Sequence, residues 1–168
     1  MKRNFIVICL ALLVSISCTS LKVPVPKEDN ETQLLVCIKT ETVDQYKFFA
    51  SYKVFLDNGD SFRITPSEGY LHIKSLPPGE YKVIGRQAYY KNTGRYGSYS
   101  ELNIPFTLEP RTITILPSFF ALRIGRAQKE GRYTQYFSAM RMGSIHREEA
   151  RDYLAEFENI SHWKIRDF

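Results

Sequence analysis

Cysteine and histidine are the residues of this 168-residue chain whose chemistry is easiest to recognise from spacing, and both are scarce. The three cysteines are Cys9, Cys18 and Cys37. An odd and widely spaced set cannot form a disulfide framework, and no Cys/His cluster has the spacing of a metal site. The histidines, at positions 72, 146 and 162, show no His-Glu-x-x-His pattern. The sequence therefore predicts neither a metal nor a cofactor.

No catalytic motif stands out among the remaining residues. Residues 97–101 read Gly-Ser-Tyr-Ser-Glu and lack the second glycine and the strand-turn-helix setting of a nucleophile elbow. A glycine-rich phosphate loop is missing as well. Glu148 and Glu149 are neighbours on a predicted helix, so their carboxylates diverge. We therefore predict that the protein is not an enzyme.

Cys18 is the one residue for which the sequence predicts a specific chemical reaction, because of the pattern of the residues before it. Lys2 and Arg3 are followed by an apolar run over residues 5–14 and by small residues up to Cys18. This order of a basic, an apolar and a small-residue region is typical of a secretory signal peptide, and the run is too short to span a bilayer.

The segment Val14-Ser15-Ile16-Ser17-Cys18 resembles a bacterial lipobox, with Ser15 where that family usually has leucine. The resemblance implies cleavage before Cys18 and a thioether from its sulfur to diacylglycerol, which a hydroxyl could not replace. Two or three acyl chains give stable anchoring. Thr19 is not the Asp that retains such lipoproteins in the inner membrane, which favours the outer membrane. The alternative is an ordinary secretory signal, cut near Ser17, with Cys18 incidental.

Loss of residues 1–17 would leave 151 residues with a net charge of +3 instead of +5. Residues 18–32 then form the lipidated N-terminus and a flexible tether rich in Pro, Lys, Glu and Asp. Cys37 lies in an apolar run over residues 34–38, where a free cysteine is more often a small buried hydrophobe than a reactive thiol.

A period-two apolar pattern, rich in β-branched and aromatic residues, predicts strands for residues 33–142. The segments are 34–38, 46–56, 61–64, 70–74, 81–88, 102–108, 112–116 and 119–125, with a further candidate at 133–141. Short strands at this spacing indicate a mainly β protein, a single antiparallel β-sandwich of about seven or eight strands. Asn58-Gly59 predicts a type I′ hairpin turn, and Pro105 predicts an edge strand.

A helical pattern is confined to the tail, residues 143–168. Ser144 is a candidate N-cap, and Ala150, Tyr153, Leu154 and Phe157 share one face of the predicted helix. We expect this face to pack on an open side of the sandwich.

The segment Leu76-Pro77-Pro78-Gly79-Glu80-Tyr81 resembles the central hairpin of carboxypeptidase regulatory-like and prealbumin-type β-sandwiches. In that hairpin the prolines stiffen the corner, Gly79 would supply a positive φ, and Tyr81 would return into the core. The resemblance implies a non-catalytic module for adhesion, stability or spacing.

A tyrosine-rich stretch over residues 89–99 is the strongest candidate for binding. We predict a binding loop containing Tyr90, Lys91, Arg95, Tyr96 and Tyr99, because tyrosine in Gly/Ser/Asn loops provides rigid amphipathic contact area. Sugar, peptidoglycan or protein would all fit such a loop. The alternative is an ordinary hairpin whose tyrosines end or flank strands. His72, between Leu71 and Ile73, is expected to face solvent or a polar cavity.

A second cluster is basic and comprises Arg123, Arg126, Lys129, Arg132 and Arg141. It could meet anionic lipid headgroups or lipopolysaccharide, although a solvated charged face is the simpler interpretation.

Together these patterns predict a lipid-anchored bacterial envelope lipoprotein, periplasmic or surface-facing, that binds or supports other envelope components. Its expected partners are the membrane, through the N-terminal lipid, and an envelope protein or glycan, but not nucleic acid. Two alternatives stay open: an accessory domain of an envelope enzyme or transport system, and a small hydrolase with an unrecognised site.

Overall fold

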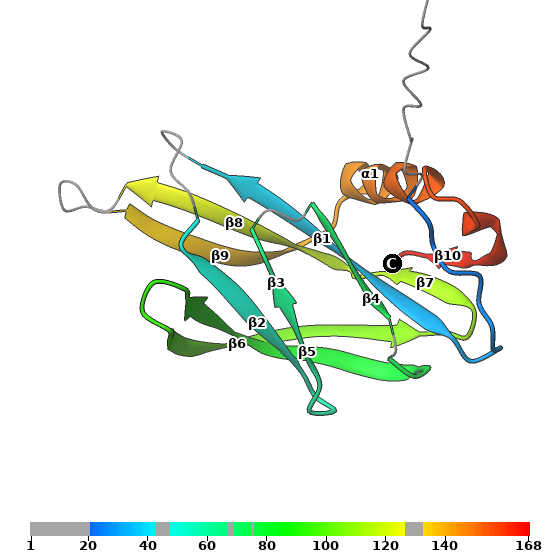
Figure 1. Cartoon of the computed structure of the whole chain (residues 1–168), viewed down its shortest axis with the longest axis horizontal. Coiled ribbons are helices and arrows are strands. Elements are labelled where there is room, and N and C mark those ends of the chain that lie inside the picture. The colour runs from blue at the N-terminus through cyan, green and yellow to red at the C-terminus, as the bar shows by residue number, and fades with distance from the viewer. Residues whose placement is uncertain (1–20, 43–47, 67–68, 75, 127–132) are drawn as a thin grey trace, which may run out of the picture.

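Two β-sheets packed face to face, with one helix on the outside, form the protein (Figure 1). The computed structural model describes residues 21–42, 48–66, 69–74, 76–126 and 133–168. Cys18 and the predicted signal peptide lie outside these ranges. The mainly β sandwich with a C-terminal helix that the sequence predicts is confirmed. Within the described ranges, no helix is long and apolar enough to cross a membrane.

The first sheet is built around β1 (Thr32–Glu41) and is mixed rather than purely antiparallel. Along one side β1 pairs antiparallel with β4 (Tyr70–Lys74). Along the other side it pairs in parallel with β7 (Thr112–Ile115) and then with β8 (Ser118–Arg126). The outer strands are β9 (Tyr133–Arg141), antiparallel to β8, and β10 (Lys164–Arg166), parallel to β7.

The second sheet is antiparallel, with the order β3-β2-β5-β6. Its strands are β3 (Ser61–Ile64), β2 (Ala50–Leu56), β5 (Gly79–Tyr90) and β6 (Arg95–Leu108). β6 lies at an edge of this sheet and carries Pro105, so the predicted edge strand is confirmed. An edge suits proline because its nitrogen has no hydrogen to donate to a neighbouring strand.

Two expectations about glycines in turns are wrong. At the β2–β3 hairpin only Gly59 has a positive φ, of 91°, so the turn is not type I′. The Gly59 N–H bonds to the Leu56 carbonyl and the Leu56 N–H to the Asp60 carbonyl, which is a three-residue loop with a bulge at glycine. Gly79 has no positive φ, because it already lies in β5. Tyr81 does return into the core, where its hydroxyl donates to the Pro77 carbonyl oxygen at 2.7 Å.

The main core lies between the sheets. Its centre is a group of rings packed at a tilt, with the centroid of Phe137 at 4.7 Å from Tyr52 and 5.1 Å from Phe120. Leu34 and Val36 of β1, both fully buried, contribute from the first sheet. Alternating apolar residues predicted these strands correctly because every second side chain of a strand points toward this core.

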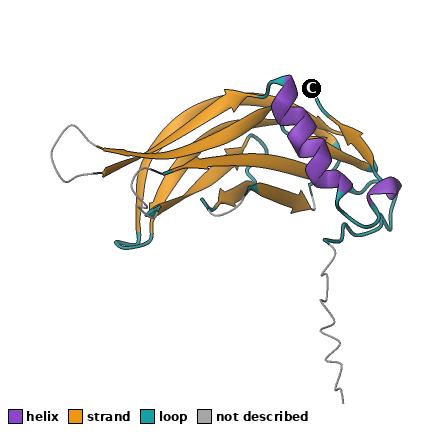
Figure 2. Ribbon diagram, turned by 90° about the horizontal axis from the view of Figure 1, so that it is seen from above, coloured by secondary structure: helices purple, strands orange, loops and turns teal. Residues whose placement is uncertain are grey.

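A second core covers the outer face of the first sheet. There α1 (Ser144–Ala155) packs on Leu35 and Cys37 of β1, with Leu154 fully buried (Figure 2). β1 is therefore buried on both faces, which explains its unbroken apolar run. Ser144 begins the helix instead of capping it: Gly143 is at the N-cap position, and no side chain bonds there.

Residues 21–31 do not behave as the predicted tether. Val23 is 2% exposed, its N–H bonds to the Glu158 carbonyl, and the Trp163 Nε1–H donates to the Pro24 carbonyl oxygen at 2.8 Å. The chain thus joins the folded body from Leu21 onward, beside the segment that contains η1 (Ile160–His162). The expected tether over residues 18–32 is corrected for its described part, because the C-terminal segment supplies partners for that stretch.

Candidate functional site

The tyrosine-rich stretch is a hairpin and not a long loop. β5 continues to Tyr90 and β6 begins at Arg95, so only four residues, 91–94, connect them. Gly94, with φ of 65°, allows this tight connection. The alternative interpretation of the sequence is therefore confirmed, and the predicted binding loop is wrong as a loop.

The five predicted binding residues do not come together. Tyr90 points to the inner side, where it packs against the main core and stacks on Phe49 with centroids 6.2 Å apart. Lys91 and Arg95 are exposed at the turn. Tyr96 and Tyr99 are on the outer face of the second sheet, 53% and 47% exposed. Only these last two share a surface that a ligand could reach.

Two further aromatic residues extend that surface. Tyr89 pairs with Tyr96 across the β5–β6 ladder, with centroids 5.1 Å apart, and Phe55 lies 5.7 Å from Tyr99. Two cations flank the rings: Arg63 is 5.1 Å from the Tyr89 centroid, and Lys53 is 5.1 Å from that of Phe55. We call this surface the aromatic face; it comprises Lys53, Phe55, Arg63, Tyr89, Tyr96 and Tyr99.

Tyr99 is held in place by its surroundings. Its hydroxyl donates to the Ile84 carbonyl oxygen at 3.0 Å, and its ring lies over Gly85. A Cβ at Gly85 would fall 2.0 Å from the Tyr99 hydroxyl oxygen, so glycine is needed for the ring to lie flat. The ring therefore loses little conformational entropy when a ligand stacks on it.

Sequence reasoning missed Phe55, Lys53 and Arg63, although a signal existed. Tyr52, Val54 and Leu56 alternate toward the core, so Lys53 and Phe55 must face outward on β2. An outward phenylalanine near an outward lysine could have indicated that the candidate binding surface is the outer face of the sheet rather than the tip of the hairpin. The sequence could not predict that β3 and β6 contribute to the same surface, since that depends on the order of the strands in the sheet.

The predicted basic cluster is only partly described. Arg123 forms an ion pair with Glu41 at 3.4 Å, and Arg141 is exposed. Lys129, Arg132 and the side chain of Arg126 lie outside the described residues. Arg123 instead lines a groove of about 1260 Å³ on the outer face of β1, β8 and β9, together with Phe119, Tyr136 and Met140. His146 stacks on Phe119 at this groove, with centroids 4.4 Å apart.

His72 and Cys37 are packing residues in the second core. The expectation that His72 faces solvent or a polar cavity is wrong: its ring lies 5.1 Å from Phe157 and 5.8 Å from Tyr153, under α1. Burial, aided by Lys74, lowers the pKa of His72 to about 4. Burial raises the pKa of Cys37 to about 12, so its thiol is a poor nucleophile, and the expectation of a packed cysteine is confirmed.

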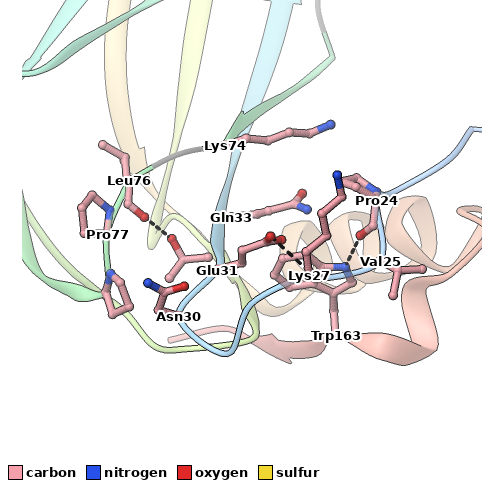
Figure 3. A pocket seen from close by; sticks show the side chains of 12 residues that line it. Pro24, Val25, Lys27, Asn30, Glu31, Gln33, Lys74, Leu76, Pro77 and Trp163 are labelled. Carbon is pink, nitrogen blue, oxygen red and sulfur yellow. Dashed lines mark hydrogen bonds between the residues drawn. The ribbon is translucent and has the colours of Figure 1, made fainter.

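A pocket of about 470 Å³ lies between the N-terminal segment and the β4–β5 connection (Figure 3). Lys27 and Lys74 line it, and neither ammonium group forms an ion pair with a described residue. Thr32 bonds to the Leu76 carbonyl across its base, and Glu31 accepts the Lys27 backbone N–H at 3.1 Å. The described residues that line the pocket include no histidine and no pair of facing carboxylates that could act as acid and base.

The described residues include one open sheet surface on which aromatic rings and cations gather. No group of three or more His, Cys, Asp or Glu side chains within them could hold a metal ion. The aromatic face combines exposed rings with cations, which suits stacking and charge recognition. Comparison with family models, with curated proteins and with solved structures finds no match to this chain.

Proposed function

We propose that the protein is a lipid-anchored envelope lipoprotein of the outer membrane whose β-sandwich is a non-catalytic binding module. The observation that supports binding is the aromatic face, four aromatic rings and two cations on an open sheet surface. The ligand that fits best is an envelope glycan that carries acidic groups. Rings such as Tyr96 and Tyr99 stack on the apolar faces of sugars, while Lys53 and Arg63 attract the acids.

The pre-set geometry of the rings supports this proposal. Tyr99 is fixed by its hydroxyl bond and by Gly85, and Tyr89 and Tyr96 support each other across the ladder. A flat surface built on strands gives up little entropy on binding, in contrast to a flexible loop. An extended polymer is the kind of ligand that a flat and open face can hold.

The lipid anchor is supported by the sequence around Cys18 and by the position of the chain that follows it. Leu21, only three residues after Cys18, already contacts the folded body. The stiff corner at Pro77 and Tyr81 supports a carboxypeptidase regulatory-like origin for the sandwich, in keeping with a spacer or adhesion module.

Detergent partitioning of the full-length protein, expressed in a bacterium, tests the anchor. We expect the protein to enter the detergent phase and the Cys18→Ser variant to stay in the aqueous phase, because only a thiol accepts the diacylglyceryl group. Mass spectrometry of the mature N-terminus should show the added lipid. If both proteins remain aqueous, the chain is not a lipoprotein.

Co-sedimentation with purified peptidoglycan sacculi, and with lipopolysaccharide, tests the binding site. We expect Tyr96→Ala and Tyr99→Ala to weaken sedimentation at least tenfold. Tyr136→Ala is the matched control, because Tyr136 is 49% exposed on the other sheet. Equal loss in all three variants, or in none, would reject the aromatic face as the binding site. Retained binding only to envelope proteins would favour a protein ligand.

A further inference from the structure

Residues 21–27, here called the N-terminal segment, join the proposed anchor to the sandwich. We propose, on the basis of the proposed lipidation of Cys18, that this segment lies directly on the bilayer surface. The side chains of Leu21 and Val25 then enter the headgroup region. The partner is a lipid surface, and the domain is held against it rather than away from it.

Covalent geometry limits the distance between lipid and domain. Consecutive Cα atoms are about 3.8 Å apart, so three steps from Cys18 to Leu21 span at most about 11 Å. That reach is far shorter than a fifteen-residue tether would have. A domain attached in this way cannot rise clear of the headgroups on the side where Leu21 is fixed.

Hydrogen bonds fix the N-terminal segment to the body. The Glu158 N–H bonds to the Leu21 carbonyl at 3.0 Å, the Val23 N–H bonds to the Glu158 carbonyl at 3.3 Å, and Lys22 pairs with the Glu158 carboxylate at 2.9 Å. Trp163 adds its bond to Pro24. The segment therefore cannot peel away to lengthen the tether without breaking several contacts at once.

Exposed apolar side chains lie in the same segment. Val23 is buried, whereas Leu21 is 49% exposed and Val25 is 44% exposed. Beside them, Figure 3 shows Lys27 and Lys74 extending over the pocket. Apolar side chains next to unpaired ammonium groups are the composition that binds a surface of anionic lipids.

A fluorescent reporter tests this contact in the lipidated protein. Val25→Cys and Lys91→Cys are each labelled with an environment-sensitive NBD maleimide. The mature chain offers no competing thiol, because Cys18 is acylated and Cys37 is buried with a raised pKa. Lys91 is exposed in the β5–β6 turn, which Figure 1 shows at the opposite end of the long axis from the N-terminal segment.

The labelled proteins are placed in vesicles of phosphatidylethanolamine and phosphatidylglycerol. We expect a blue shift and a several-fold rise in emission at position 25 but not at position 91. Adding Leu21→Asn to the Val25 reporter should reduce the rise by at least half while the protein stays bound to vesicles. Water-like emission at both positions in vesicle-bound protein would overturn the contact and leave the anchor intact.

Vesicle flotation separates this failure from failure of the proposed function. If the full-length protein and its Cys18→Ser variant both fail to float with the vesicles, the anchor itself is absent, and the surface contact that depends on it is rejected as well. If the protein floats fully and the emission is equal at positions 25 and 91, the anchored domain has no preferred contact with the bilayer. Only the proposed contact of the N-terminal segment then fails.

Discussion

The outer faces of the two sheets differ in how far other segments of the chain cover them. On the first sheet, α1 and the N-terminal segment cover the part formed by β1 and β7, where Leu35, Cys37 and Ile113 are at most 2% exposed; Tyr136 and Met140 of β9 stay about half exposed. On the second sheet, Tyr96 and Tyr99 are about half exposed, and Arg63 is exposed as well. Two segments far apart in the sequence thus close this part of the first sheet, while the second sheet keeps aromatic rings in reach of solvent.

This difference shows that an aromatic residue becomes a packing or a surface residue according to whether another element covers its face of the sheet, and not according to its type. Tyr70 and Tyr153 stack with centroids 4.0 Å apart beneath α1, as a packing pair. Tyr89 and Tyr96 form a tilted pair on the open face, with centroids 5.1 Å apart. Tyr70, Tyr153 and Tyr89 are half-buried, whereas Tyr96 is 53% exposed, so the two faces should respond differently to the same kind of substitution.

The largest expected effect is on the closed face. Leu154→Ala should lower the free energy of unfolding by about 2–5 kcal/mol, because Leu154 is fully buried and the cavity cannot be filled by solvent. Ile145→Ala on the same helix is the control, since Ile145 is 68% exposed and should change stability by less than about 0.5 kcal/mol. Urea unfolding measures both. A small effect of Leu154→Ala would mean that α1 does not close the face.

A second test uses pH. The pKa of His72 is about 4 in the folded protein, against 6.5 ordinarily, so the unfolded chain takes up a proton first as pH falls. Stability from this group is complete above pH 6.5 and is lost as pH falls toward 4, by about 2 kcal/mol given its partial exposure. His72→Leu should flatten the profile of thermal unfolding between pH 6.5 and 4. The exposed His162→Gln should leave it unchanged.

Trp163→Phe probes the N-terminal part of the closed face. It removes the Nε1–H bond to Pro24 while keeping an aromatic ring, so we expect a loss of about 1 kcal/mol. Hydrogen exchange at the Val23 amide should accelerate, whereas exchange in β5 should not change. Unaltered exchange at Val23 would show that the segment is held without this bond.

The smallest effect on stability is expected on the open face. Gly85→Ala places a methyl group against Tyr99, and the ring can rotate outward, so stability should fall by less than about 1 kcal/mol. Binding to the proposed glycan ligand should nevertheless weaken, because Tyr99 leaves the aromatic face. Gly69→Ala is the matched control, since nothing lies within 4 Å of its added Cβ. Intact binding by Gly85→Ala would remove Tyr99 from the site.

Alternation was sufficient to place most strands. Residues 61–64, 70–74 and 133–141 were predicted with the bounds that the structure has. In the first two segments apolar residues repeat at every second position, as Phe62 and Ile64 do. Parallel pairing of β1 with β7 could not be read, since it depends on contacts far apart in the chain.

The candidate site was only half predictable. Tyr96 and Tyr99 were found because tyrosine in a Gly/Ser/Asn-rich stretch is typical of binding surfaces. Tyr90 was misassigned because β5 continues to Tyr90, so that regular alternation turns its side chain inward together with Ala88. His72 was misplaced because nothing in β4 itself indicates that a helix covers it.

The pairing of β1 also governs the order in which the protein can fold. Thr32 has Thr112 as its partner, 80 positions later, so the first sheet cannot close until two thirds of the chain is available. Such distant contacts slow folding, since a long loop must close before they form. A chain that folds this slowly would suit the proposed export, because it would still be unfolded when it reaches the membrane.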